Sequence, residues 1–135
     1  MLRKLTILMA AGALALAAAT AWAAEPITIG YSIAKTGLFS KAAPSQITAY
    51  ELWAEQVNAR GGLDVAGTRR PVKFVWYDDE SSPAKAAQIY EKLINDDKVD
   101  LLFAPWGTPH HLSVAGVVEK YKFPMMGNTA ASVAL

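Results

Sequence analysis

Two short loops carry the residues most able to bind a small ligand. In the first, the segment 105–107 (Pro-Trp-Gly) follows an apolar run, and Thr108-Pro109 begins a predicted helix. The N–H groups and dipole of a helix start, with the Thr108 hydroxyl, favour an anion such as a carboxylate. Gly107 would let that ligand approach the main chain closely. The sequence also leaves open a plainer and more common role, in which Thr108 only caps the helix.

The second loop, residues 127–132 (Gly-Asn-Thr-Ala-Ala-Ser), is small and polar. Its hydroxyl and amide groups could complete a carboxylate or ammonium site beside Thr108. Such a composition also serves an ordinary strand-to-helix turn, and the residues themselves do not decide between the two.

Two further clusters could in principle do metal or acid chemistry. His110 and His111 are adjacent, so on a helix they point about 100° apart and rarely reach one ion. The acids at 78–80 (Asp-Asp-Glu) could hold Mg²⁺ or act as catalytic carboxylates, but a turn that exposes its acids to solvent is the favoured interpretation. We therefore expect no metal ion and no cofactor.

The motifs of the common enzyme and nucleotide-binding classes are missing from the sequence. It contains no GxGxxG, GxxxxGK[ST] or GxSxG motif, and Lys35-Thr36 lacks a preceding glycine-rich loop. No nucleophile is accompanied by a base and an orienting acid. The sequence therefore favours a binding protein over an enzyme.

The elements that must position these loops alternate between strands and helices. Strands are predicted at 27–31, 72–77, 99–104 and 123–126, and helices over 44–59, from Pro83 and from Thr108. This order predicts an open, doubly wound α/β parallel sheet. Ligands of such sheets bind beyond the carboxyl ends of the strands, where the loops 32–40, 78–82, 105–108 and 127–132 would meet.

Local signals sharpen several of these elements. Over 44–59 an apolar stripe recurs at helical spacing, and Gly61-Gly62 stops the helix. A short loop or hairpin is predicted around 65–68. Ser82 can cap the next helix, with Pro83 at its first position.

The first 23 residues resemble an export signal. Arg3 and Lys4 precede an uncharged apolar run over 5–19, and Ala-Trp-Ala at 21–23 predicts cleavage before Ala24. The chain has no cysteine, so we expect a periplasmic protein that is not a lipoprotein. Loss of Arg3 and Lys4 would take the formal net charge from +1 to −1, which gives no basic footprint for nucleic acid. We expect residues 24–135 to be the opening part of a longer protein.

Four segments in order resemble the type I periplasmic binding proteins. They are the strand and broken loop at 27–37, the N-x-x-G-G-L motif at 58–63, the D-D-x-x-x-P-x-x-A motif at 78–86, and the two loop regions at 101–113 and 123–131. The group most similar to this chain is the leucine/isoleucine/valine-binding proteins of ABC transporters. The resemblance implies that residues 24–135 form the N-terminal part of the first of two lobes.

The resemblance further implies capture of an amino acid and its delivery to permease subunits of an ABC transporter. An alternative is a periplasmic sensor for another small carboxylate or amide that signals to a membrane partner. Many relatives have serines where this chain has residues 106–110, which opens the site to ligands other than branched-chain amino acids. The ligand-binding residues implied are Trp106, Gly107, Thr108, Thr129, Ala130 and Ser132.

Overall fold

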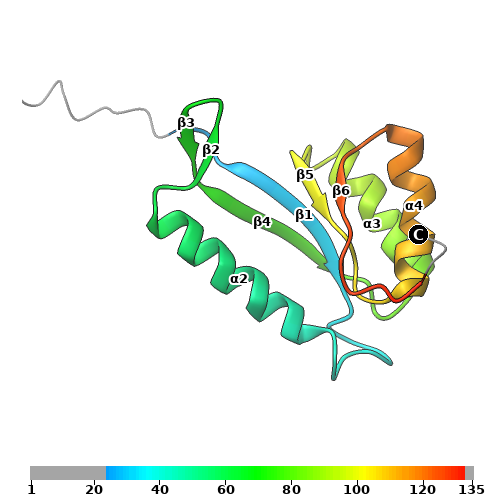
Figure 1. Cartoon of the computed structure of the whole chain (residues 1–135). Helices are drawn as coiled ribbons and strands as arrows, with labels where there is room; N and C mark the ends of the chain where they lie inside the picture. The colour runs from blue at the N-terminus through cyan, green and yellow to red at the C-terminus, as the bar shows by residue number, and fades with distance from the viewer. Residues whose placement is uncertain (1–23, 133–135) are drawn as a thin grey trace, which may run out of the picture.

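A four-stranded parallel sheet organises the part of the chain that the computed structural model describes, residues 24–132 (Figure 1). Its order is β4-β1-β5-β6, and each neighbouring pair is parallel. The predicted open α/β sheet is confirmed. The predicted signal peptide, residues 1–23, lies outside the described residues. The strands are β1 (Ile27–Ile33), β4 (Val72–Asp78), β5 (Leu101–Phe103) and β6 (Met125–Met126).

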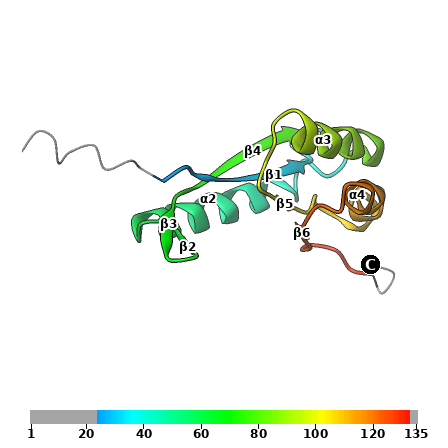
Figure 2. The same cartoon turned by 90° about the horizontal axis from the view of Figure 1, so that it is seen from above.

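Helices cover both faces of this sheet (Figure 2). The helix α2 (Pro44–Ala59) packs on one face, whereas α3 (Pro83–Asn95) and α4 (Thr108–Tyr121) lie on the other. Each face of the sheet has a hydrophobic core. Alternate side chains of a strand point to the same face, so Ile29, Tyr31 and Ile33 of β1 are all buried in the core under α2. The sheet is therefore doubly wound, as predicted.

Local sequence signals account for the helix ends. Ser82 caps α3, since its hydroxyl accepts a hydrogen bond from the Lys85 N–H at 3.3 Å, and Pro83 is the first helical residue. At the end of α2, the N–H of Gly61 donates to Asn58 O and that of Gly62 to Val57 O. This pair of bonds is the Schellman arrangement, which satisfies the last carbonyls of the helix.

A small antiparallel hairpin follows α2, with strands β2 (Leu63–Val65) and β3 (Thr68–Arg70). Of the loop or hairpin predicted around 65–68, the structure has the hairpin. In Figure 1 the hairpin lies at the end of the sheet opposite the carboxyl ends of the strands.

Two strands begin later than predicted because the N–H groups before them bond back to the preceding helices. The N–H of Val99 donates to Leu93 O at 3.2 Å, which joins it to the end of α3 rather than to the sheet. Similarly, the N–H of Phe123 donates to Val118 O at 2.9 Å and closes α4. Pro124 has no N–H to give to a ladder.

The two glycines after α2 give a matched test of this helix stop. Both have positive φ, 89° at Gly61 and 97° at Gly62, so a side chain at either costs about 1–2 kcal/mol. A Cβ at Gly62 would also lie 2.1 Å from Arg70 O, whereas one at Gly61 meets nothing within 4 Å. Gly62→Ala should therefore lower the free energy of unfolding by about 1–3 kcal/mol more than Gly61→Ala.

Urea unfolding followed by circular dichroism measures both variants. Equal losses in the two variants would contradict the close approach of Gly62 to the chain after β3.

Candidate functional site

The two loops predicted to bind a ligand lie against each other beyond the carboxyl ends of β5 and β6. The hydroxyl of Thr108 accepts a hydrogen bond from the Ala131 N–H at 3.0 Å. The Thr129 hydroxyl donates to Pro105 O at 3.4 Å. Segments 105–108 and 127–132 thus form one polar junction, as their places after neighbouring parallel strands require.

The alternative in which Thr108 only caps α4 is wrong. Thr108 is the first residue of the helix, and the cap position belongs to Gly107, with φ 89° and no side-chain cap bond. A residue with a side chain rarely adopts that φ, so the turn requires glycine and moves the cap one residue earlier than predicted. The Thr108 hydroxyl therefore serves the facing loop, and it can still donate its own proton.

The first turn of α4 presents main-chain donors at this junction. Pro109 has no N–H, and the His111 N–H donates to Gly107 O at 3.2 Å. The N–H groups of Thr108 and His110 are the remaining donors at this helix start, and no carbonyl within the helix can reach them. With the helix dipole, they suit a carboxylate.

A polar network from α2 holds the loop 127–132, and sequence analysis missed it. Tyr50 Oη accepts hydrogen bonds from the side-chain amides of Gln46, at 2.6 Å, and of Asn128. Gln46 also donates to Ala104 O at 3.3 Å, and its Oε1 lies 3.4 Å from Thr129 Oγ1. Burial raises the pKa of Tyr50 above its ordinary value, which keeps the hydroxyl protonated.

The six predicted residues divide between two sides of the junction. Trp106 stands with Phe39 of the β1–α2 loop, their ring centroids 5.1 Å apart. A cavity of about 530 Å³ lies between α4 and the last loop. Its lining includes Thr129, Ala130 and Ser132 but not Trp106, Gly107 or Thr108. The two loops therefore meet, while their predicted residues do not all face one cavity.

The acidic turn after β4 anchors other loops. Asp78 accepts hydrogen bonds from the N–H groups of Lys35 and Thr36 and from the Thr36 hydroxyl at 2.8 Å. Burial favours a raised pKa at Asp78, but the bonds from the Glu80 N–H and from Thr36 outweigh it and lower the pKa. Glu80 pairs with Lys85 at 2.6 Å.

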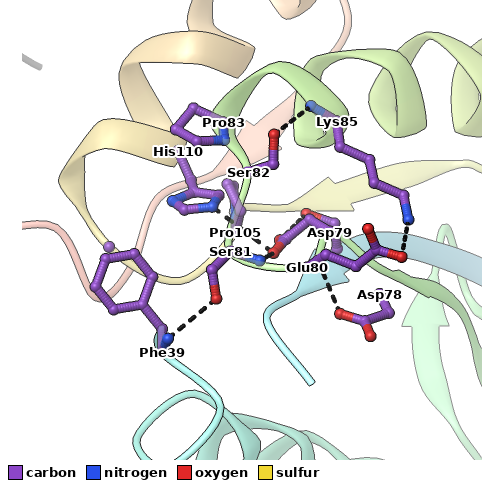
Figure 3. Close-up of polar contacts among 12 residues, drawn as sticks. Phe39, Asp78, Asp79, Glu80, Ser81, Ser82, Pro83, Lys85, Pro105 and His110 are labelled. Carbon is purple, nitrogen blue, oxygen red and sulfur yellow. Dashed lines mark hydrogen bonds and ion pairs between the residues drawn. The ribbon is translucent and has the colours of Figure 1, made fainter. Parts of the chain in front are cut away.

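Asp79 is not the solvent-exposed acid that the sequence predicted. Its side chain is completely buried and accepts a hydrogen bond from Ser32 Oγ at 2.7 Å. It accepts a second from the Ser81 N–H at 3.0 Å (Figure 3). The residue follows β4, at the edge of the sheet, and its contacts with Ser32 of β1 and His110 of α4 come from distant parts of the chain that its sequence neighbours could not reveal.

The two histidines differ in their surroundings. His110 is fully buried, and its Nε2 lies 3.7 Å from Asp79 Oδ1. Burial lowers the pKa of His110, and the Asp79 carboxylate opposes that shift in part. His111 Nδ1 lies 3.0 Å from Gly107 O. Within residues 24–132, no three acids or histidines gather in a way that could hold a metal ion.

Over residues 24–132, no helix combines the length and the apolar character that a bilayer span needs.

Comparisons with known proteins agree with this geometry. The family described as periplasmic binding protein matches residues 26–134. Among solved structures, the branched-chain amino acid transporter substrate binding protein LivJ from Streptococcus pneumoniae, in complex with isoleucine, aligns over 81% of this chain with a TM-score of 0.72 and 21% identity. At that identity the likeness shows the fold.

Two other solved structures have higher identity. An extracellular ligand-binding receptor from Rhodopseudomonas palustris HaA2 is 29% identical over 82% of this chain, with a TM-score of 0.61. A periplasmic binding protein type 1 from Bordetella pertussis Tohama I is 27% identical over 76%, with a TM-score of 0.63. The matched regions cover 30%, 27% and 26% of the Streptococcus, Rhodopseudomonas and Bordetella proteins, so this chain spans under a third of their length.

The buried His110 predicts how stability depends on pH. Because its folded pKa is lowered, the unfolded chain binds a proton there that the folded chain does not. Stability should be full above about pH 6.5, the value of an unfolded histidine, and should fall as the pH drops towards the lower folded pKa.

Thermal unfolding between about pH 7.5 and 5.5 measures this slope, with the only other histidine as control. In the His110→Gln variant the melting temperature should no longer depend on pH over that range. In the His111→Gln variant it should still fall as the pH drops. The reverse pattern would mean that His110 is not the group responsible.

Proposed function

The chain belongs to the periplasmic binding protein family, and from that premise we propose that it captures an amino acid, of the branched-chain type or related, for delivery to an ABC transporter permease. The observation that carries the proposal is the Thr108–Ala131 contact, which joins a helix start to a second polar loop at the carboxyl edge of the sheet. The isoleucine complex of the Streptococcus pneumoniae relative supports this ligand class.

In the proposed site, the ligand carboxylate binds at the start of α4. The N–H of Thr108 and the Thr108 hydroxyl donate to it, and Gly107 leaves the main chain open to approach. Residues of the facing loop, Thr129, Ala130 and Ser132, offer hydroxyl and carbonyl oxygens to the ligand ammonium group. Ammonium and carboxylate then lie side by side, as they do in an α-amino acid.

Trp106 forms an apolar wall of this site. Its ring is half-buried against Phe39, so one surface remains for a ligand side chain. Burial of apolar ligand surface there would contribute about 25 cal/mol per Å² before the costs of association. A bulky wall next to a carboxylate site suits an amino acid with an apolar side chain.

The remaining parts of the proposal concern the protein as a whole. Residues 1–23 act as a signal for export to the periplasm, and Ala24 rather than a cysteine follows the predicted cleavage point, so the signal is not of the lipoprotein type. Residues 24–135 contribute to the first of two lobes that close on the ligand. The ligand is bound and released without chemical change.

A thermal-shift screen tests the ligand class. The mature protein should melt at higher temperature with L-leucine, L-isoleucine or L-valine, or with a related amino acid. At about 100 times the dissociation constant the ligand should add about 2.7 kcal/mol of stability. The matching amines without a carboxylate, such as isoamylamine, serve as controls. If amines stabilise as well as amino acids, or if no amino acid stabilises, the ligand class is wrong.

Substitution of Thr108 tests the site itself. Thr108→Ala should weaken binding of L-isoleucine by about 1.5–3 kcal/mol, the range for a hydrogen bond to a charged group. Thr108→Ser keeps the hydroxyl and should restore most of the affinity. Thr68→Ala, on the exposed β3 strand of the distant hairpin, is the matched control. Calorimetry that finds equal affinity in all three variants would remove Thr108 from the site.

A further inference from the structure

Asp79 joins three segments that the proposed site depends on. Its carboxylate accepts hydrogen bonds from Ser32 at the end of β1 and from Ser81 in its own turn, and it faces His110 in the first turn of α4. Ser81 extends the connection to the β1–α2 loop, because its hydroxyl donates to Thr36 O and accepts from the Phe39 N–H at 3.0 Å. Figure 3 shows the contacts of Asp79 with Ser81 and His110, and the contact of Ser81 with Phe39.

The contact between Asp79 and His110 is incomplete. The 3.7 Å from Nε2 to Oδ1 is longer than a hydrogen bond. Within the described residues, neither ring nitrogen of His110 has a hydrogen-bond partner, although the side chain is fully buried. Buried polar groups of this kind cost free energy until they are paired. A shift of roughly 1 Å would give His110 a hydrogen bond to a carboxylate, one of the stronger kinds in proteins.

Among residues 24–132, no other carboxylate pairs with His110. From the turn after β4, Asp78 is bonded to the Lys35–Thr36 main chain and Glu80 pairs with Lys85 of α3. Among the described residues, the other titratable groups near the pair are Tyr90 of α3, whose pKa is raised by burial and in part by the Asp79 carboxylate, and His111 of α4, which helps to lower the pKa of His110.

The ring of Phe39 closes the remaining side of His110. It packs edge-on, with centroids 5.7 Å apart. The β1–α2 loop therefore presents an apolar surface to the imidazole, and Asp79 is the one anionic group in contact with it among the described residues.

Movement of His110 would be transmitted directly to the proposed ligand site. His110 is two residues after Thr108 in the same helical turn, so a shift of the imidazole towards Asp79 carries the Thr108 and His110 N–H groups with it. We propose that Asp79 and His110 are positioning residues, whose contact sets the first turn of α4 for the ligand carboxylate and closes to a hydrogen bond when that site is filled. This inference rests on the proposed function.

If Asp79 and His110 served only to pack the protein interior, different results would be expected. If Asp79 and His110 only fill the space under α4, their substitution should change the stability of the protein and leave the ligand loop and its affinity unchanged. If they position the turn, the protonation of His110 should be visible at the loop itself.

Nuclear magnetic resonance of the protein without ligand reads the positioning directly. The amide shifts of Gly107, Thr108 and Ala131 should follow the titration of the His110 ring, with a midpoint below the ordinary histidine value. Asp79→Asn removes the attraction to the imidazolium and should move that midpoint lower. His110→Gln keeps a donor in place of Nε2 but cannot titrate. In this variant the chemical shifts of the loop amides should therefore no longer change with pH. His111→Gln should leave the titration in place.

Calorimetry with L-isoleucine as the probe gives the second arm. Asp79→Asn and His110→Gln should each weaken binding about 10-fold, the effect of losing one hydrogen bond to a charged group. Asp97→Asn is the matched control, since this carboxylate pairs with Lys92 at the far end of α3 and should change affinity less than about 2-fold. If Asp79→Asn does not fold, His110→Gln supplies both readouts.

The two arms separate this inference from the proposed function. If L-isoleucine and related amino acids do not bind the wild-type protein, the proposed function fails, and the loop amides still show whether the pair positions the turn. If the wild-type protein binds but the variants bind equally well, the positioning role is wrong. If the chemical shifts of the loop amides do not change as His110 titrates, the positioning role is also wrong.

Discussion

The parallel pairing of β1 with β4 and β5 is the constraint on which the rest of this structure depends. Seven residues of β1 pair in register with β4, from Ile27 with Val72 to Ile33 with Asp78. Parallel strands leave the sheet on the same side, so the loops after all four strands must meet at one edge. A slip of one residue would move the β1 side chains that pack on α2 to the opposite face of the sheet, which is also buried, and would displace those loops.

At that edge, hydrogen bonds between loops replace the regular pairing of the strands. Asp78 and Ser81 hold the β1–α2 loop, while Gln46 and Tyr50 of α2 hold the last loop. The loops are therefore fixed to the end of β4 with its following turn and to α2. A binding site built this way loses little conformational freedom on filling, which favours affinity.

How much of this could be read from the sequence depended on the range of the interactions involved. The bounds of α2 and the Ser82 cap follow from neighbouring residues, and both were predicted. The ends of β5 and β6 depend on bonds to helices, and the burial of Asp79 depends on elements up to 47 residues away. The cap of α4 was predicted one residue late because the positive φ of Gly107 belongs to the turn rather than to Thr108.

In the candidate site, too, some features could be predicted from the sequence and others depend on distant contacts. The convergence of the loops 105–108 and 127–132 was predictable, because strand order and helix starts locate them. The contacts of Gln46, Tyr50 and Asn128 were not, since those residues look like ordinary helix and loop positions in the sequence.

The central claim is that the start of α4 and the facing loop receive the carboxylate and ammonium groups of one small ligand. A crystal structure of the mature protein with bound L-isoleucine tests it most directly. The account predicts the ligand carboxylate within about 2.7–3.2 Å of the Thr108 N–H or hydroxyl. A bound ligand whose carboxylate lies away from the first turn of α4 would contradict it.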